Sequence, residues 1–243
     1  MKRLKEACAK YKYQIPVTAF IFNMIALAVI IVLAKGSNYV AASTDSADTK
    51  PTVILDAGHG GEDCGTIGVS GVYEKDLNFE ITLKLGEYLT AAGYNVIYTR
   101  TADSLLYTDE ENIKGMRKIS DLKNRVKIAN GYEDAIFISI HMNSYGAAEC
   151  KGFQAYFSNS AEGSKELAAA IQGSVKNKLQ STNNRMTKSG SDLYILENSK
   201  NPAVILECGF LSNPDECKKL SEKEYQKELC FAILCGIIEY NKK

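Results

Sequence analysis

The 243-residue sequence contains only two histidines, and both occupy positions where a reactive group could act. His59 follows the apolar segment VILDAG, and His141 follows AIFISI. Such segments predict buried strands, and functional groups in open α/β sheets gather where strands end. A single histidine is more often structural than a ligand. Two histidines at two strand ends, however, favour a shared role in metal binding.

A carboxylate would complete a metal site of this kind. Zinc takes at least three protein ligands, and two histidines with one carboxylate form a known set that leaves a position for water. Glu74 is the best candidate, because it stands between the glycine-rich segment 58–71 and the predicted helix that follows. A glutamate that merely faces solvent at a helix start is the alternative. We predict that His59, Glu74 and His141 bind Zn²⁺.

A second glutamate, Glu207, ends the apolar run AVILE and is followed by Cys208. An acidic side chain at the end of a buried strand is costly unless it is paired or has a chemical role. A zinc hydrolase needs a carboxylate that takes a proton from the attacking water. We therefore predict a catalytic role for Glu207, with a salt bridge to a basic side chain as the alternative.

The elements that must position these residues follow from the alternation of apolar runs and amphipathic stretches after Pro51. This alternation predicts one α/β domain of three layers, with a mostly parallel six-stranded sheet and helices on both faces. The expected strands are 52–56, 94–98, 135–140, 152–157, 193–196 and 203–206. The expected helices cover about 77–89 with a stop at Gly93, 122–129, 167–179 and 222–240, with Ser221 as N-cap of the last.

The N-terminal part of the chain has a different character. Residues 15–34 carry no charged side chain and are long enough to cross the roughly 30 Å hydrocarbon layer as a helix. Five basic residues and one acidic residue among the first twelve favour a cytoplasmic N-terminus. We expect a signal anchor that tethers the domain outside the membrane; the alternatives are a cleaved signal peptide, giving a secreted domain, and a buried core helix. The predicted organisation is a basic cytoplasmic segment 1–14, a membrane segment 15–34, a flexible linker 35–50 and a catalytic domain 51–243.

Composition excludes several other classes of protein. Basic and acidic residues balance at 29 each, so no general attraction to nucleic acid is expected, and 45% hydrophobic residues argue against disorder. Six of the seven cysteines follow the predicted membrane segment, but no C-x-x-C occurs. A domain of this size can be stable without crosslinks, so we expect no disulfides. Cys208, Cys230 and Cys235 are predicted to be core residues.

Four segments carry a resemblance to a known family. VILDAGHGG, GVYEKDLN, SIHMNS and ILECGFLSNPDE resemble, in order and spacing, the signature blocks of the zinc-dependent N-acetylmuramoyl-L-alanine amidases of the amidase-3 type. The resemblance covers nearly all of residues 51–240. It implies a metal site at His59, Glu74 and His141, a catalytic Glu207 and no cofactor beyond zinc. Asn143 also matches a family position, as a substrate contact or a support for the ligands.

The resemblance implies that peptidoglycan is the substrate, cleaved between the lactyl group of N-acetylmuramic acid and L-alanine. A membrane-tethered domain without wall-binding repeats is similar to the germination-specific amidases of spore-forming bacteria, which act on the spore cortex. The expected partners are peptidoglycan and, through residues 15–34, the cytoplasmic membrane, with an activator protein as a further candidate.

Two other classes of protein stay open. Another zinc-dependent wall peptidase or deacetylase would use the same ligands, and a non-catalytic wall-binding protein could use the same pocket. The absence of H-E-x-x-H removes the commonest metalloprotease signature, and the absence of G-x-S-x-G argues against a serine hydrolase.

Overall fold

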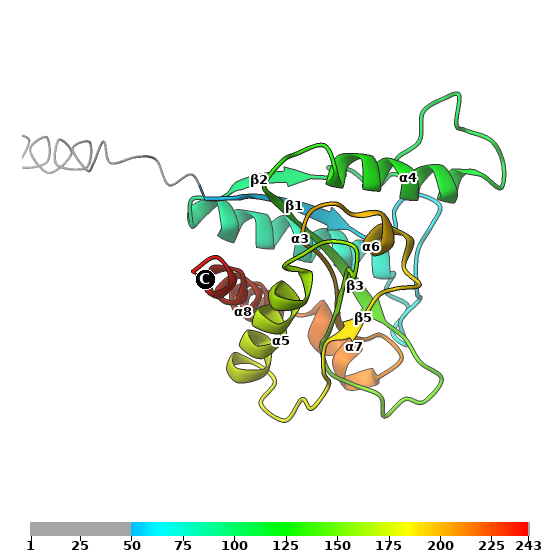
Figure 1. The fold of residues 1–243 in the computed structure, drawn as a ribbon. Helices are drawn as coiled ribbons and strands as arrows, with labels where there is room; N and C mark the ends of the chain where they lie inside the picture. Colours follow the sequence, from blue (N-terminus) through cyan, green and yellow to red (C-terminus); the bar gives the residue numbers. More distant parts are fainter. Residues whose placement is uncertain (1–49, 243) are drawn as a thin grey trace, which may run out of the picture. The chain divides into compact units, whose positions relative to one another are not determined.

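A computed structural model of the chain describes residues 50–242 and shows a single six-stranded sheet in the order β2-β1-β3-β6-β4-β5 (Figure 1). Strand β4 runs antiparallel to β6, and all other neighbouring strands are parallel. The predicted α/β class with a mostly parallel sheet is confirmed. The strands are β1 (Thr52–Ala57), β2 (Asn95–Tyr98), β3 (Ala135–Asn143), β4 (Gln154–Phe157), β5 (Lys188–Ser189) and β6 (Ala203–Phe210). The helices are α3 (Glu74–Ala91), α4 (Arg117–Ala129), α5 (Ser164–Lys178), α6 (Tyr194–Asn198), α7 (Pro214–Ser221) and α8 (Lys223–Tyr240).

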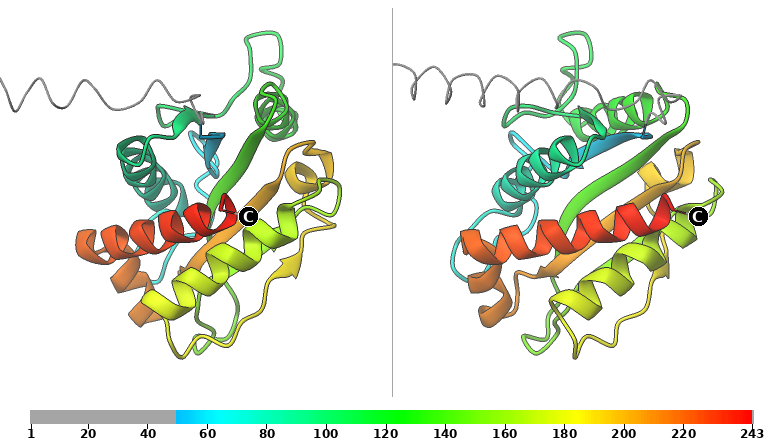
Figure 2. Two further views of the ribbon diagram at one scale, coloured as in Figure 1. Left: turned by 60° about the vertical axis from the view of Figure 1, so that its left-hand side comes forward. Right: turned by 90° about the vertical axis from the view of Figure 1, so that its left-hand side faces the viewer.

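Helices cover both faces of the sheet, as predicted. Helices α3, α5 and α8 pack on one face, where α5 and α8 lie side by side (Figure 2). Helices α4 and α6 contact each other on the opposite face and bury a smaller apolar cluster there. Because both faces are covered, the central strands read as continuous apolar runs. Residues 53–57 of β1 are accordingly all buried.

The two central strands that carry predicted site residues are longer than their apolar runs suggest. Strand β3 continues through His141 to Asn143, and β6 continues through Glu207 to Phe210. His141 and Glu207 are direct neighbours in the register, and an irregularity follows between His141 and Asn143. The site therefore forms at the C-terminal ends of β1, β3 and β6, where parallel strands present their functional groups.

The prediction of a strand at 193–196 is wrong. Residues Tyr194–Asn198 form the short helix α6, whose Ile195 and Leu196 pack against the sheet. The remaining strand of the six-stranded sheet is β5, which has two residues and pairs with β4. A four-residue apolar run fits a buried helical turn as well as a strand, because periodicity cannot separate the two at that length.

The helix boundaries correct one further prediction and confirm another. Helix α8 begins at Lys223 after Glu222, whereas Ser221 ends the unpredicted helix α7 and donates its hydroxyl to the Cys217 carbonyl. Asn213 caps α7 by accepting from two backbone amides, and a proline follows it in the first turn. At the end of α3 the predicted stop is confirmed, since Gly93 has φ +87° directly after the C-cap.

No disulfide joins the six cysteines between residues 50 and 242. Cys208 and Cys230 are buried in the core as predicted, but Cys235 is only partly buried. The predicted membrane segment 15–34 and linker 35–50 lie outside the described residues, apart from Lys50. Within the described part of the chain, no helix is both long and apolar enough to span a membrane.

Candidate metal centre and active site

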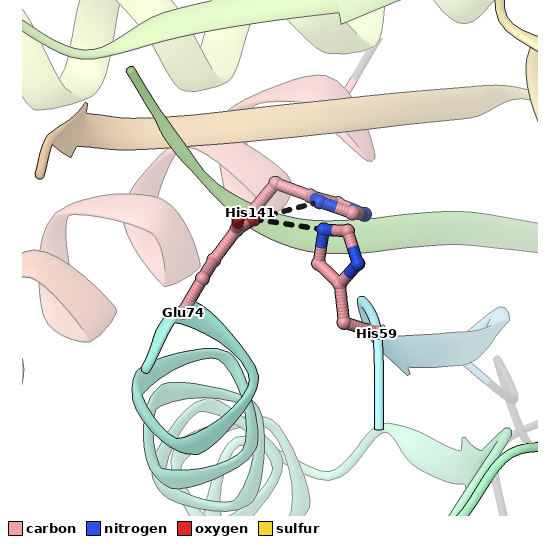
Figure 3. A group of neighbouring side chains, drawn as sticks. All are labelled: His59, Glu74 and His141. Carbon is pink, nitrogen blue, oxygen red and sulfur yellow. Dashed lines mark hydrogen bonds and ion pairs between the residues drawn. The ribbon is translucent and has the colours of Figure 1, made fainter. Parts of the chain in front are cut away.

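The three predicted metal ligands converge at one point although they come from three elements (Figure 3). His59 lies in the loop after β1, Glu74 is the first residue of α3, and His141 lies near the end of β3. Glu74 Oε1 is 3.2 Å from His59 Nε2 and 3.1 Å from His141 Nδ1. One ligand atom of each residue lies within 4.8 Å of the other two, so the group could hold a metal ion.

The carboxylate of Glu74 is buried. The alternative considered from the sequence, a glutamate at a helix start that faces solvent, is therefore wrong. Glu74 is 3% exposed and accepts hydrogen bonds from the backbone amides of Thr66 at 2.8 Å and Met142 at 3.1 Å. Burial alone would raise its pKa, but hydrogen bonds with His141 and His59 outweigh burial and hold the pKa well below its usual range. The N-terminus of α3 also favours the anion. The carboxylate therefore stays ionised, as a metal ligand requires.

His59 is held in an unusual backbone conformation with one ring nitrogen already occupied. Its φ is +63°, a left-handed value that costs a non-glycine residue about 1–3 kcal/mol. Nδ1 lies 2.9 Å from Asp63 Oδ2, which turns Nε2 toward Glu74. Burial opposes protonation, but Asp63 and Glu74 together raise the pKa of His59 to about 9. A carboxylate behind a histidine is the usual support of a metal ligand, and the sequence analysis did not assign this role to Asp63.

Two buried arginines fix the loop that carries His59. Arg125 of α4 donates to the carbonyl oxygens of Ala57 and His59, at 2.8 Å each. Its guanidinium also pairs with Asp56 of β1 and with Asp121 one helical turn earlier. Arg100 donates from Nε to the Ala57 carbonyl at 2.9 Å. Both arginines therefore support the backbone of the site.

Gly58 allows His141 to reach the centre. A Cβ atom at Gly58 would lie 2.2 Å from Cε1 and from Nε2 of the His141 ring, far closer than real contacts allow. We expect Gly58→Ala to displace the ring and to weaken metal binding by about 10- to 100-fold, as for other changes that misplace a ligand. Isothermal titration with Zn²⁺ measures this effect. Gly173→Ala is the control, because its Cβ would meet nothing within 4 Å; equal zinc affinity in the two variants would contradict the prediction.

Glu207 lies beside the His141 position, on the neighbouring strand. Its Oε2 is buried and has no hydrogen-bond partner among residues 50–242, and the side chain forms no ion pair there. The salt bridge considered as the alternative is therefore absent from the described part of the chain. Burial raises the pKa of Glu207 to about 6, against the opposing effect of His141. An orphaned, buried carboxylate oxygen is costly and calls for a chemical explanation.

These residues line one open hollow of about 400 Å³. Asn143 lies in its wall, and its Oδ1 accepts from the Ser144 backbone amide at 2.8 Å. Lys118 of α4 also borders the hollow, where its Nζ lies 3.1 Å from Asp63. The structure thus brings all five predicted site residues together. Asp63 and Lys118 are additions that only the folded chain reveals.

The geometry agrees with a match to a protein family. The family model described as N-acetylmuramoyl-L-alanine amidase matches residues 53–239, which is most of the chain. The chain belongs to this family. The match spans β1 through most of α8, so the amidase domain is the whole sheet with its helices.

Individual relatives support the same assignment. This amidase is 34% identical over 188 residues to the germination-specific N-acetylmuramoyl-L-alanine amidase of Bacillus subtilis, covering 77% of this chain and 78% of that protein. The solved CwlD amidase from Clostridioides difficile, in complex with the GerS lipoprotein, is 41% identical, with a TM-score of 0.75 over 79% of this chain and 98% of that one. An N-acetylmuramoyl-L-alanine amidase from Clostridium difficile 630 is 31% identical, with a TM-score of 0.70 over 80% of this chain and 98% of the other.

Proposed function

We propose that this amidase is a zinc-dependent peptidoglycan hydrolase that cleaves the amide between the lactyl group of N-acetylmuramic acid and L-alanine of the stem peptide. The observation that carries the proposal is the convergence of His59, Glu74 and His141 next to a buried carboxylate oxygen of Glu207 that has no partner among the described residues. Family membership supplies the choice of amide, because the ligands alone would serve a peptidase or a deacetylase equally well.

The residues present fit zinc. Two imidazoles and one carboxylate form a donor set that zinc uses in catalytic sites, and Glu74 remains ionised for that purpose. Asp63 supports His59 from behind, as carboxylates do for zinc-bound imidazoles. When bound, zinc would supply a Lewis acid for the amide carbonyl and would make water a stronger nucleophile near neutral pH.

The chain's own residues would then carry the proton transfers. Glu207 is placed to accept a proton from the attacking water, because its Oε2 has no hydrogen-bond partner within residues 50–242 and the neighbouring strand carries His141. The same carboxyl would return the proton to the leaving L-alanine nitrogen, which otherwise departs as an unstable anion. A pKa raised by burial suits a group that must both accept and release a proton. Asn143 in the wall of the hollow would contact the substrate or support the ligands.

Digestion of purified peptidoglycan tests this function directly. Residues 51–243 with bound zinc should release stem peptides that begin with a free L-alanine, and mass spectrometry identifies the new ends. Treatment with a chelator should stop the release, and added Zn²⁺ should restore it. Vegetative wall and spore cortex should be digested in parallel. Cuts within the stem peptide, loss of acetyl groups or binding without cleavage would each refute the proposal in favour of one of the alternatives.

We also propose a setting for this activity in the spore cortex, outside a membrane to which residues 15–34 tether the domain. The similarity to a germination-specific amidase supports the cortex, and the uncharged run supports the tether. A lipoprotein is the class of protein partner to test, since the CwlD amidase was solved in complex with one. Fractionation of expressing cells should recover the intact chain with membranes; recovery of a shortened chain in the medium would instead show cleavage.

A further inference from the structure

Arg185 has no acidic partner among the described residues, and it contacts Gln154, the neighbour of Glu207 in the sheet register. It lies between α5 and β5, in the segment that returns to the sheet edge (Figure 1). Nε donates to the Lys151 carbonyl at 2.9 Å, and Nη1 donates to Gln154 Oε1 at 2.8 Å. The guanidinium carbon lies 4.5 Å from the centre of the Phe210 ring. Three contacts therefore hold this guanidinium in one orientation.

The register of the sheet places Arg185 on the face that carries Glu207. Gln154 of β4 is paired directly with Glu207 of β6. Directly paired residues point to the same face, and neighbouring strands are about 4.8 Å apart. Because Arg185 contacts the side chain of Gln154, its guanidinium lies about one strand beyond Glu207, toward the sheet edge.

The charge of Arg185 is not neutralised within the described part of the chain. Residues 50–242 contain no ion pair to its guanidinium, and Nη2 donates to no acceptor there. The nearby carboxylate of Glu216 is already engaged by the backbone amides of Gly152 and Phe210. By contrast, Lys118, which borders the hollow at the metal ligands, is paired with Asp63. A fixed, half-buried guanidinium with a spare donor is suited to a carboxylate ligand.

We propose that Arg185 binds the free carboxylate on the second residue of the stem peptide and sets a preference for substrates that carry it. This inference rests on the proposed amidase function. The lactyl carboxyl is consumed in the amide that is cleaved, so the free carboxylates near that amide belong to the stem peptide. Two residues of extended chain reach about 7 Å, which exceeds the spacing of about 4.8 Å between the neighbouring strands that carry Glu207 and Gln154. Stem peptides carry at this second residue either a carboxylate or its amide.

A pair of substrates that differ only at that group tests the proposal. The probes are two disaccharide tetrapeptides, one with a free carboxylate on the second residue and one with the carboxamide. The zinc-loaded wild-type domain should cleave the carboxylate form with a kcat/KM about tenfold higher, mainly through a lower KM. Arg185→Gln should bring the ratio of the two kcat/KM values close to one, by raising KM for the carboxylate form. Arg185→Lys should restore only part of the preference, because it keeps the charge but loses the planar fork.

Lys188→Gln is the matched control. It removes the same charge three residues later, where the ammonium lies 5.6 Å from the centre of the Tyr156 ring and has no ion pair among the described residues. This variant should keep the wild-type preference. If Arg185→Gln and Lys188→Gln lose the preference for the carboxylate substrate equally, the cause is the general positive charge of this region. That result would overturn a specific contact with Arg185. An equal loss of rate on both substrates in Arg185→Gln, with a lower melting temperature, would show that Arg185 only anchors its segment. If the wild-type domain cleaves neither substrate, the proposed function itself fails.

Discussion

Glu207→Gln should abolish most turnover while leaving the fold and the metal site intact. The amide cannot accept the proton of the attacking water, so we expect kcat to fall by about 10²-fold or more. Zinc content should stay at the wild-type level, because Glu207 is not one of the three converging ligands. Hydrolysis of a defined muropeptide, together with metal analysis of the same sample, measures both effects.

The same substitution should not destabilise the domain. In the metal-free protein, burial raises the pKa of Glu207 to about 6 from an ordinary value of 4.5, so ionising the side chain opposes folding. The folded state holds the extra proton between these values, and stability should therefore decrease as pH rises from about 4.5 to 6. Above that range the ionised Glu207 lowers the free energy of unfolding by its full amount, about 2 kcal/mol. Glutamine avoids this loss.

Glu133→Gln is the matched control, since it makes the same chemical change in an exposed loop before β3. It should alter neither turnover nor the pH dependence of unfolding. A Glu207→Gln enzyme that retains activity within tenfold of the wild type, with full zinc content, would contradict the assigned role. Loss of zinc in that variant would instead place Glu207 among the metal ligands.

Arg125→Met should have the largest effect on stability, about 3–5 kcal/mol in the free energy of unfolding. The change leaves Asp56, which is 0% exposed, without its guanidinium partner. At present Arg125, Ser139 and Thr99 outweigh the effect of burial and keep the pKa of Asp56 lowered. Without Arg125, burial is opposed by fewer groups, so the pKa of Asp56 should rise. The carbonyl of His59 also loses its donor, so metal affinity should fall together with stability.

Urea unfolding of three variants separates the loss of an ion pair in general from the effect of leaving the buried Asp56 charge without its partner. Arg117→Met removes an ion pair to Glu62 at an exposed site, where the side chains are 32% and 57% exposed, and should cost no more than about 1 kcal/mol. The double variant Asp56→Asn with Arg125→Met removes the stranded charge and should be more stable than Arg125→Met alone. An Arg125→Met domain within about 1 kcal/mol of the wild type would show that the buried pair is not important for stability.

The sequence by itself determined which residues could act as metal ligands or as a proton acceptor, and it determined the order of the main helices and strands. With two histidines in the chain, imidazole ligands could only be His59 and His141, and apolar runs of the right length located β1, β3 and β6. Glu74 was placed by a local rule, because a glycine-rich loop that leads into a helix predicts where the first turn lies. These features depend on neighbours in the chain, and so they can be read from it.

Tertiary structure decided which other groups hold the candidate ligands in place. Asp63 contacts the His59 ring in a loop where His59 itself has a left-handed backbone conformation. Arg125 contacts Asp56, which lies 69 positions away in the sequence. The difference between α6 and a strand was likewise settled by packing on the sheet, since the run itself fits both. Hydrogen bonds with His141 and His59 keep the buried Glu74 charged, and one buried oxygen of Glu207 has no partner among residues 50–242. Such effects depend on solvent exclusion and on contacts between distant segments, which exist only once the chain has folded.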